Sequence, residues 1–119
     1  MNNPNAIYVP CTIDSLVSLK FTIEHQLSLK YEDIDKSTEY HIYNLSDNSD
    51  IYDIFVTYNK NIKLDKQEIM VSQKKLLHRI YNVLLMICDH CWVDDVVDTA
   101  FSSYNICYCS NCHIRKRVW

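Results

Sequence analysis

The residues with the clearest chemistry lie between Cys88 and Cys112, a segment that holds five of the six cysteines of this 119-residue chain. Two pairs, Cys88/Cys91 and Cys109/Cys112, each have the spacing C-x2-C, and 17 residues separate the two pairs. This arrangement is typical of a tetrahedral zinc site built from two short turns. Zinc prefers four sulfur or nitrogen ligands at roughly 2.0–2.3 Å. The segment therefore predicts a bound zinc ion on a zinc-ribbon-like hairpin.

Three of the four zinc ligands are expected to be Cys88, Cys109 and Cys112, and the fourth is either His90 or Cys91. A C-x2-C turn favours Cys91, because its backbone amides can bond the thiolates and thiolate binds zinc tightly. An extended segment favours His90, because residues at i and i+2 lie on the same side of a strand. The residues alone leave this choice open.

We expect the zinc to be structural and the protein to have no catalytic residues. A catalytic zinc keeps one position open for water and has a general base nearby. Asp94, Asp95 and Asp98 could supply a carboxylate, but the H-x-E motif of zinc deaminases is absent and no proline precedes Cys109. Four strong ligands would close the site. The aspartates are then expected to bond backbone amides, to pair with Arg115 or Arg117, or to be solvated.

Three further residues have simpler expected roles. Trp92 is predicted to pack over the metal site, although exposed tryptophans are also common at protein interfaces. Cys107 is predicted to pack on a strand as a small apolar residue. Cys11, far from the other cysteines in sequence, is predicted to be a thiol outside the metal site.

The pattern C-x-H-x-W-x-D-D-x-x-D followed by I-x-Y-C-x-x-C resembles a short zinc module of uncharacterised proteins of giant nucleocytoplasmic DNA viruses. The matching positions here are Cys88, His90, Trp92, Asp94, Asp95, Asp98, Ile106, Tyr108, Cys109 and Cys112. The resemblance covers about 25 of the 119 residues. It implies that His90 is the fourth ligand and that a leucine-rich helix precedes the module. The chain departs from the pattern in its cysteines at positions 91 and 107, and in Ala100-Phe101 where a proline often stands.

The helix that would position this module is predicted from about Lys66 to Ile87. Asp65 followed by Glu68 indicates a capped N-terminus. The apolar residues after it recur at spacings of three, four and seven, with no proline or glycine between them. This apolar stripe consists of Ile69, Leu76, Ile80, Val83, Leu84 and Ile87.

The first 63 residues are predicted to form a small antiparallel sheet after an extended or poorly ordered lead-in over residues 1–10. Apolar and polar residues alternate over Leu16–Ile23 and again over residues 27–31, which is typical of half-buried strands. Tyr40–Leu45 and Ile51–Tyr58 are rich in aromatic and β-branched residues and predict two more strands. The predicted fold class is α+β, with a β domain over 1–63, a long amphipathic helix over 64–87 and a zinc module with a basic tail over 88–119.

Composition excludes several classes of protein. The chain has a net charge of −3 and lacks the basic total of a general nucleic-acid-binding protein. It contains no glycine, which excludes Gly-rich phosphate loops. The sequence contains no apolar run of about 18 residues, so it predicts no membrane span. The N-terminal residues do not resemble a secretion signal, so we expect the protein not to be secreted and its thiols to be reduced.

These features lead us to expect a non-enzymatic protein that contacts other proteins or a second copy of itself. The resemblance to a viral module implies a minor virion or capsid-associated component, located in the virion or in the host cytoplasm at the virus factory. An alternative is a zinc ribbon associated with nucleic acid in viral transcription or its regulation. In that case Arg115, Lys116 and Arg117 would contact phosphates.

Overall fold

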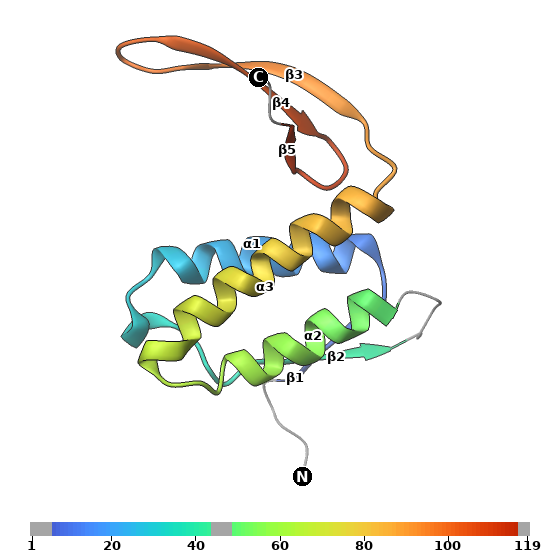
Figure 1. Cartoon of the computed structure of the whole chain (residues 1–119), viewed down its shortest axis with the longest axis vertical. Coiled ribbons are helices and arrows are strands. Elements are labelled where there is room, and N and C mark those ends of the chain that lie inside the picture. The colour runs from blue at the N-terminus through green and yellow to red at the C-terminus, as the bar shows by residue number, and fades with distance from the viewer. Residues whose placement is uncertain (1–5, 44–48, 117–119) are drawn as a thin grey trace.

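The structure, a computed structural model, describes residues 6–43 and 49–116. It combines three helices, a two-stranded parallel sheet and a three-stranded antiparallel sheet, which confirms the predicted α+β class. Figure 1 shows the helices and the parallel sheet as one body, above which the antiparallel sheet extends as an arm. Within the described residues, no helix has both the length and the apolarity needed to cross a lipid bilayer.

Helix α3 (Lys66–Ile87) begins and ends at the residues that the sequence predicts. The carboxylate of Asp65 caps it by accepting hydrogen bonds from the amides of Gln67 and Glu68, both at 3.1 Å. Five residues of the predicted stripe are buried, and Ile87 is partly buried: the five are Ile69, Leu76, Ile80, Val83 and Leu84. The helix packs against α1 and α2, and at its C-terminus it leads directly into Cys88.

The predicted strands over Leu16–Ile23 and residues 27–31 are wrong, because helix α1 (Ile13–Ser28) covers residues 16–28 and the short 3₁₀ helix η1 (Tyr31–Asp33) begins at Tyr31. Thr12 caps α1 by accepting a hydrogen bond from the Ser15 amide at 3.2 Å. The buried positions 16, 17, 19, 20, 23 and 26 follow the helical spacing, whereas Phe21, which a strand would bury beside its apolar neighbours, is exposed. The alternation of apolar and polar residues in this segment is therefore part of the apolar stripe of a helix and does not mark a strand.

The predicted strand over Ile51–Tyr58 is also wrong, because α2 (Ser49–Asn61) is a helix. Its buried residues lie at positions 51, 54, 55, 58 and 61, on one helical face. High β-propensity of isoleucine and tyrosine was therefore overridden by packing of this face against α3 and β2.

The N-terminal sheet is parallel and not antiparallel. The predicted strand over Tyr40–Leu45 is present as β2 (Glu39–Tyr43), while positions 44 and 45 lie outside the described residues. Its partner is β1 (Ala6–Pro10), which lies within the segment expected to be an extended or poorly ordered lead-in. Parallel strands need a long crossover, and here α1 and the short 3₁₀ helix η1 (Tyr31–Asp33) supply it.

A buried polar network connects the three helices. The amide of Gln26 donates to the Tyr58 hydroxyl at 2.7 Å, and Gln73 donates to Gln26 Oε1 at 2.8 Å. Asn61 then donates to Gln73 Oε1 at 3.1 Å. These bonds join Gln26 of α1 and Gln73 of α3 to two residues of α2, Tyr58 and Asn61. They hold the three helices in a single arrangement, because a buried amide without a hydrogen-bond partner would cost free energy.

The arm consists of β3 (Trp92–Asp98), β4 (Ser103–Cys109) and the short β5 (Arg115–Lys116). Strands β3 and β4 form the predicted hairpin, with Trp92 opposite Cys109 and Asp98 opposite Ser103. The base of the arm belongs to the main hydrophobic core, which joins residues of α1, α2 and α3 to Cys88, Cys109, Cys112 and Ile114. The body therefore fixes where the arm begins.

Candidate metal centre

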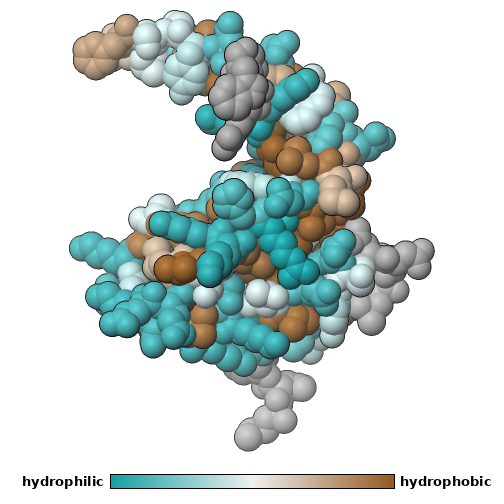
Figure 2. Space-filling view, in the orientation of Figure 1, coloured by the Kyte–Doolittle hydropathy of each residue, from teal (hydrophilic) through white to brown (hydrophobic). Residues whose placement is uncertain are grey.

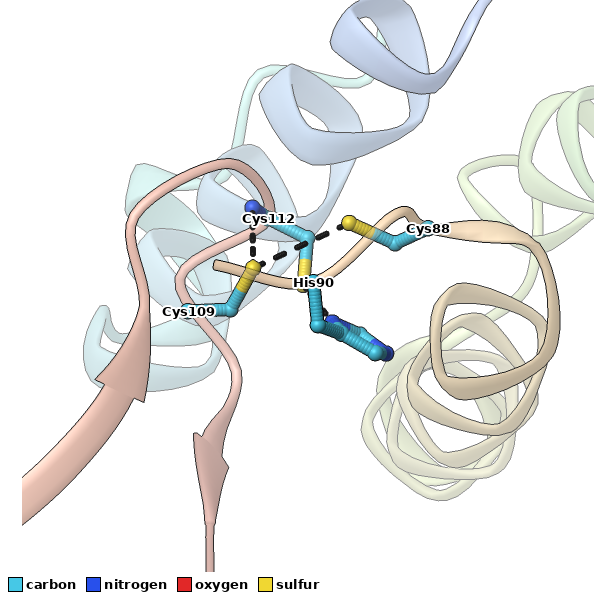
Figure 3. A group of neighbouring side chains, drawn as sticks. All are labelled: Cys88, His90, Cys109 and Cys112. Carbon is cyan, nitrogen blue, oxygen red and sulfur yellow. Dashed lines mark hydrogen bonds between the residues drawn. The ribbon is translucent and has the colours of Figure 1, made fainter. Parts of the chain in front are cut away.

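Four potential metal ligands come from two segments far apart in the sequence. Cys88 caps the C-terminus of α3 in an extended conformation, and His90 follows two residues later. Cys109 ends β4, and Cys112 lies in the turn between β4 and β5. Figure 3 shows the four side chains pointing toward one another from these two segments. Pairing of β3 with β4 brings the two segments together.

Two of the separations between donor atoms match those expected around a tetrahedral metal ion. Bonds of about 2.3 Å to sulfur and 2.0–2.1 Å to nitrogen place two sulfurs about 3.8 Å apart, and a sulfur and a nitrogen about 3.6 Å apart. The Sγ atoms of Cys88 and Cys109 are 3.8 Å apart. His90 Nδ1 lies 3.6 Å from the Sγ of Cys112. All four donor atoms lie within 4.8 Å of one another. The residues therefore form a Cys3His group that can hold a metal ion.

Hydrogen bonds orient these ligands before any metal binds. The amides of Asn111 and Cys112 donate to the Sγ of Cys109 at 3.3 and 3.4 Å. His90 Nε2 lies 3.3 Å from the carbonyl oxygen of Leu85 on α3. If Nε2 carries the proton and donates it to this carbonyl, Nδ1 keeps its lone pair for the metal, as is usual for histidine ligands.

Two further hydrogen bonds tie the two segments to each other. The Ser110 amide donates to the Cys91 carbonyl at 2.9 Å, and Asn111 Nδ2 donates to the Asp89 carbonyl at 2.7 Å. His113, just after the second turn, has a φ of 64°, a value for which glycine is normally preferred. A chain without glycine accepts this conformation here because the His113 amide bonds the Cys109 carbonyl at 2.8 Å.

The thiols differ sharply in acidity. Burial raises the pKa of Cys109, but hydrogen bonds from the Cys112 amide, from His90 and from neighbouring backbone amides outweigh it and lower the pKa to about 5. Burial, followed by the thiols of Cys112 and Cys109, raises the pKa of Cys88 to about 12. Sulfurs packed this closely cannot all ionise without a cation between them. A divalent metal would displace the remaining protons as it binds.

The structure brings His90, and not Cys91, to the three other donors. The side chain of Cys91 is exposed, and it lies outside the group of donor atoms. Cys107 is buried on β4, also outside that group. Cys11 is buried in the core at the end of β1.

Trp92 lies beside the centre, and the three aspartates of β3 are exposed. The ring of Trp92 stacks on that of His90 with centroids 4.7 Å apart, so it covers one side of the site. All three aspartates are exposed on β3, where Asp95 accepts from the Val96 amide at 2.8 Å and Asp98 accepts from the Ser103 hydroxyl at 2.5 Å. Within the described residues, none of the three pairs with Arg115, and Arg117 lies outside those residues.

Sequence reasoning missed the residues that α1 contributes around the metal centre. Phe21 packs against His113, with ring centroids 5.5 Å apart, although it comes from a segment predicted as a strand. The helical spacing of Leu16, Leu19, Lys20 and Ile23 is the signal that could have revealed this face.

A comparison of the chain with protein-family models, curated proteins and solved structures finds no match. Function is therefore inferred from the geometry described above.

Proposed function

We propose that this chain is a non-enzymatic interaction protein in which a structural zinc ion holds a β-hairpin arm in position for contact with another protein. The observation that carries the proposal is the exposure of the arm. Phe101 in the loop at its tip is 98% exposed, and Val96 and Tyr104 are 54% and 47% exposed. A large apolar side chain this accessible is characteristic of an interaction site when others lie beside it.

One face of the arm supports the same proposal. Alternation along the paired strands places five apolar residues on this face together with one acidic residue, Asp95, which lies opposite Ile106; the five are Val93, Val97, Tyr104, Ile106 and Tyr108. A two-stranded hairpin is marginally stable alone in water. We infer that the metal centre stabilises the base of the arm, and that a partner protein covers its apolar surface.

The metal is inferred to be zinc from its ligands. Three thiolates and one imidazole form a set that zinc binds well, and soft ligands disfavour magnesium and calcium. Four protein donors would complete the tetrahedron around the ion and would leave no position for a reactive water. This closed set supports a structural role.

The resemblance of the module to those of giant viruses extends the proposal to a minor virion or capsid-associated component. Proteomic analysis of purified particles would test this extension. Absence of the chain from particles whose other minor proteins are detected would reject it.

The experiment that tests the interaction role is site-specific photocrosslinking. A photoreactive phenylalanine at position 101 is expected to crosslink a partner protein in cells that produce the natural complex. Position 52 is the matched control, because Tyr52 is a 43% exposed aromatic residue on α2. Crosslinking at position 101 no stronger than at position 52 would contradict the proposal.

The alternative role, association with nucleic acid, is favoured by one observation. Arg115 and Lys116 are exposed beside Trp92, with the Lys116 ammonium 5.4 Å from the centre of the Trp92 ring. Cations next to an aromatic ring suit single-stranded nucleic acid. Oligonucleotide binding that weakens with salt, and that is lost on Arg115→Glu/Lys116→Glu, would support this alternative over the first.

A further inference from the structure

A groove of about 880 Å³ lies between helices α1 and α3 and the segment that carries the metal centre. Figure 2 shows the hollow between the arm and the helical body. The groove is lined by aromatic and cationic side chains, chiefly Phe21, Tyr81, Trp92, Lys20, Arg115 and Lys116. It therefore suits an occupant that brings both an apolar ring and negative charge.

The charge of the groove is positive once its internal contacts are counted. Glu24 is the one carboxylate among its lining residues. It already binds Lys20 at 2.9 Å and accepts from the Tyr81 hydroxyl at 2.9 Å. Within the described residues, Arg115 and Lys116 pair with no carboxylate. These two cations are left for an incoming acidic group.

The arm of the same protein carries the complementary groups. Asp94, Asp95 and Asp98 are exposed along β3, and the aromatic ring of Phe101 is exposed at the tip. At about 3.3 Å per residue, the seven residues of β3 give the arm a length of roughly 23 Å. The arm arches above the helical body and its tip lies clear of that body, so the tip is available to another molecule (Figure 1).

We propose that the groove receives the arm of a second copy of this chain, with Phe101 placed among the groove's aromatic rings and Asp98 placed near Arg115 and Lys116. An exchange around a two-fold axis would form this contact twice, as symmetric dimers do. The inference names the partner of the arm and therefore rests on the proposed function. A second copy fits better than nucleic acid because the whole chain has a net charge of −3, whereas the arm presents acidic groups beside an aromatic ring.

Sedimentation velocity of the zinc-loaded protein from about 1 to 200 µM tests the inference. The wild-type chain is expected to dimerise, more weakly at high salt because the contact is partly ionic. The arm variant Phe101→Ser and the groove variant Arg115→Glu/Lys116→Glu are each expected to weaken dimerisation at least tenfold. Tyr52→Ser and Lys74→Glu/Lys75→Glu, exposed residues on the other surfaces of α2 and α3, are the matched controls and are expected to dimerise normally.

Mixing the two variants provides the decisive measurement. The arm variant retains an intact groove and the groove variant an intact arm, so an equimolar mixture is expected to form a heterodimer through one of the two contacts. Misfolding of either variant could not produce this recovery, and zinc stoichiometry checks each fold separately. A monomer at every concentration, or no recovery in the mixture, overturns the inference.

Two results separate this inference from the function on which it rests. A monomeric protein that still crosslinks a different protein through position 101 overturns the inference and leaves the proposed function standing. A monomeric protein whose groove binds an oligo-dT probe, with binding lost in the groove variant, overturns the inference in favour of nucleic acid. Absence of any crosslink at position 101, including to a second copy, removes both.

Discussion

Replacing His90 and Cys91 in turn tests the proposed ligand set most directly. In the structure, His90 Nδ1 lies 3.6 Å from the Sγ of Cys112, while the side chain of Cys91 is exposed. Cys91 contributes only backbone groups to the site: its carbonyl accepts from the Ser110 amide and its amide bonds the sulfur of Cys109. His90→Ala therefore removes one metal ligand together with the ring that stacks on Trp92. Cys91→Ser changes a side chain that lies outside the donor group and leaves the carbonyl in place.

The expected difference follows from the energy of structural zinc sites. Such sites bind zinc with about 10–16 kcal/mol, or roughly 2.5–4 kcal/mol for each of four ligands. At 1.4 kcal/mol for each tenfold change, His90→Ala should weaken zinc binding by on the order of 10²–10³-fold. Cys91→Ser should change the affinity by less than about threefold, since it removes no ligand.

The assay is competition for zinc against a chromogenic chelator at pH 7.4, together with native mass spectrometry for stoichiometry. Cobalt substitution adds a spectroscopic control, because the intensity of the thiolate-to-cobalt band reports the number of bound thiolates. That intensity should be the same in the wild-type chain and in Cys91→Ser. Weakening of zinc binding by Cys91→Ser to the level of His90→Ala, with loss of band intensity, would refute the assignment of His90.

Three further predictions follow from the fold. Chelation of the metal should lower the melting temperature and further expose Trp92, which is 36% exposed in the structure, as measured by fluorescence, while circular dichroism retains the helices. Simultaneous loss of helix would contradict this, since the buried stripe of α3 lies mostly in the body. Burial chiefly raises the pKa of Tyr58 from 10.0 to about 12. The contribution of Tyr58 to stability is therefore complete below pH 10 and is lost as the pH rises through 12. At 1.4 kcal/mol per pKa unit, this loss is at most about 3 kcal/mol. Urea unfolding at pH 9 and 11 should show a smaller loss of unfolding free energy in Tyr58→Phe than in the wild-type chain. Gln73→Leu, which leaves Gln26 Oε1 without its donor, should lower the free energy of unfolding by about 1–3 kcal/mol in the same assay, whereas a neutral result would show that the network contributes little.

The metal centre and helix α3 were largely predictable because their signals are local. The cysteine spacing is the spacing with which two short turns can reach one ion, and recognising it requires no knowledge of the body. The capped N-terminus at Asp65 and the long uninterrupted stripe determine α3 in the same way. The hairpin β3–β4 was predictable because two halves of a metal site would have to be brought side by side.

The N-terminal region was predicted wrongly because its local signals are ambiguous. The apolar residues at positions 16, 17, 19, 21 and 23, considered without the polar residues between them, fit the pattern of a strand almost as well as that of a helix. Lys20 and Gln26 resolve the ambiguity in the structure, since both are buried on the helical stripe through their contacts with Glu24 and Tyr58. Those partners become visible only once the helices pack.

The sequence by itself determined the types of candidate metal ligand, their spacing, the helix that leads into the first of them and the α+β class. Tertiary structure decided which of His90 and Cys91 faces the other donors, because that depends on the carbonyl of Leu85 and on the direction in which the chain leaves α3. It also decided that Phe21 and Lys20 lie beside the segment of the candidate metal ligands, forming a groove from residues far apart in the chain. Local sequence patterns determine which chemical groups lie within a few residues of one another. Contacts between distant segments form only when those segments pack into a common hydrophobic core.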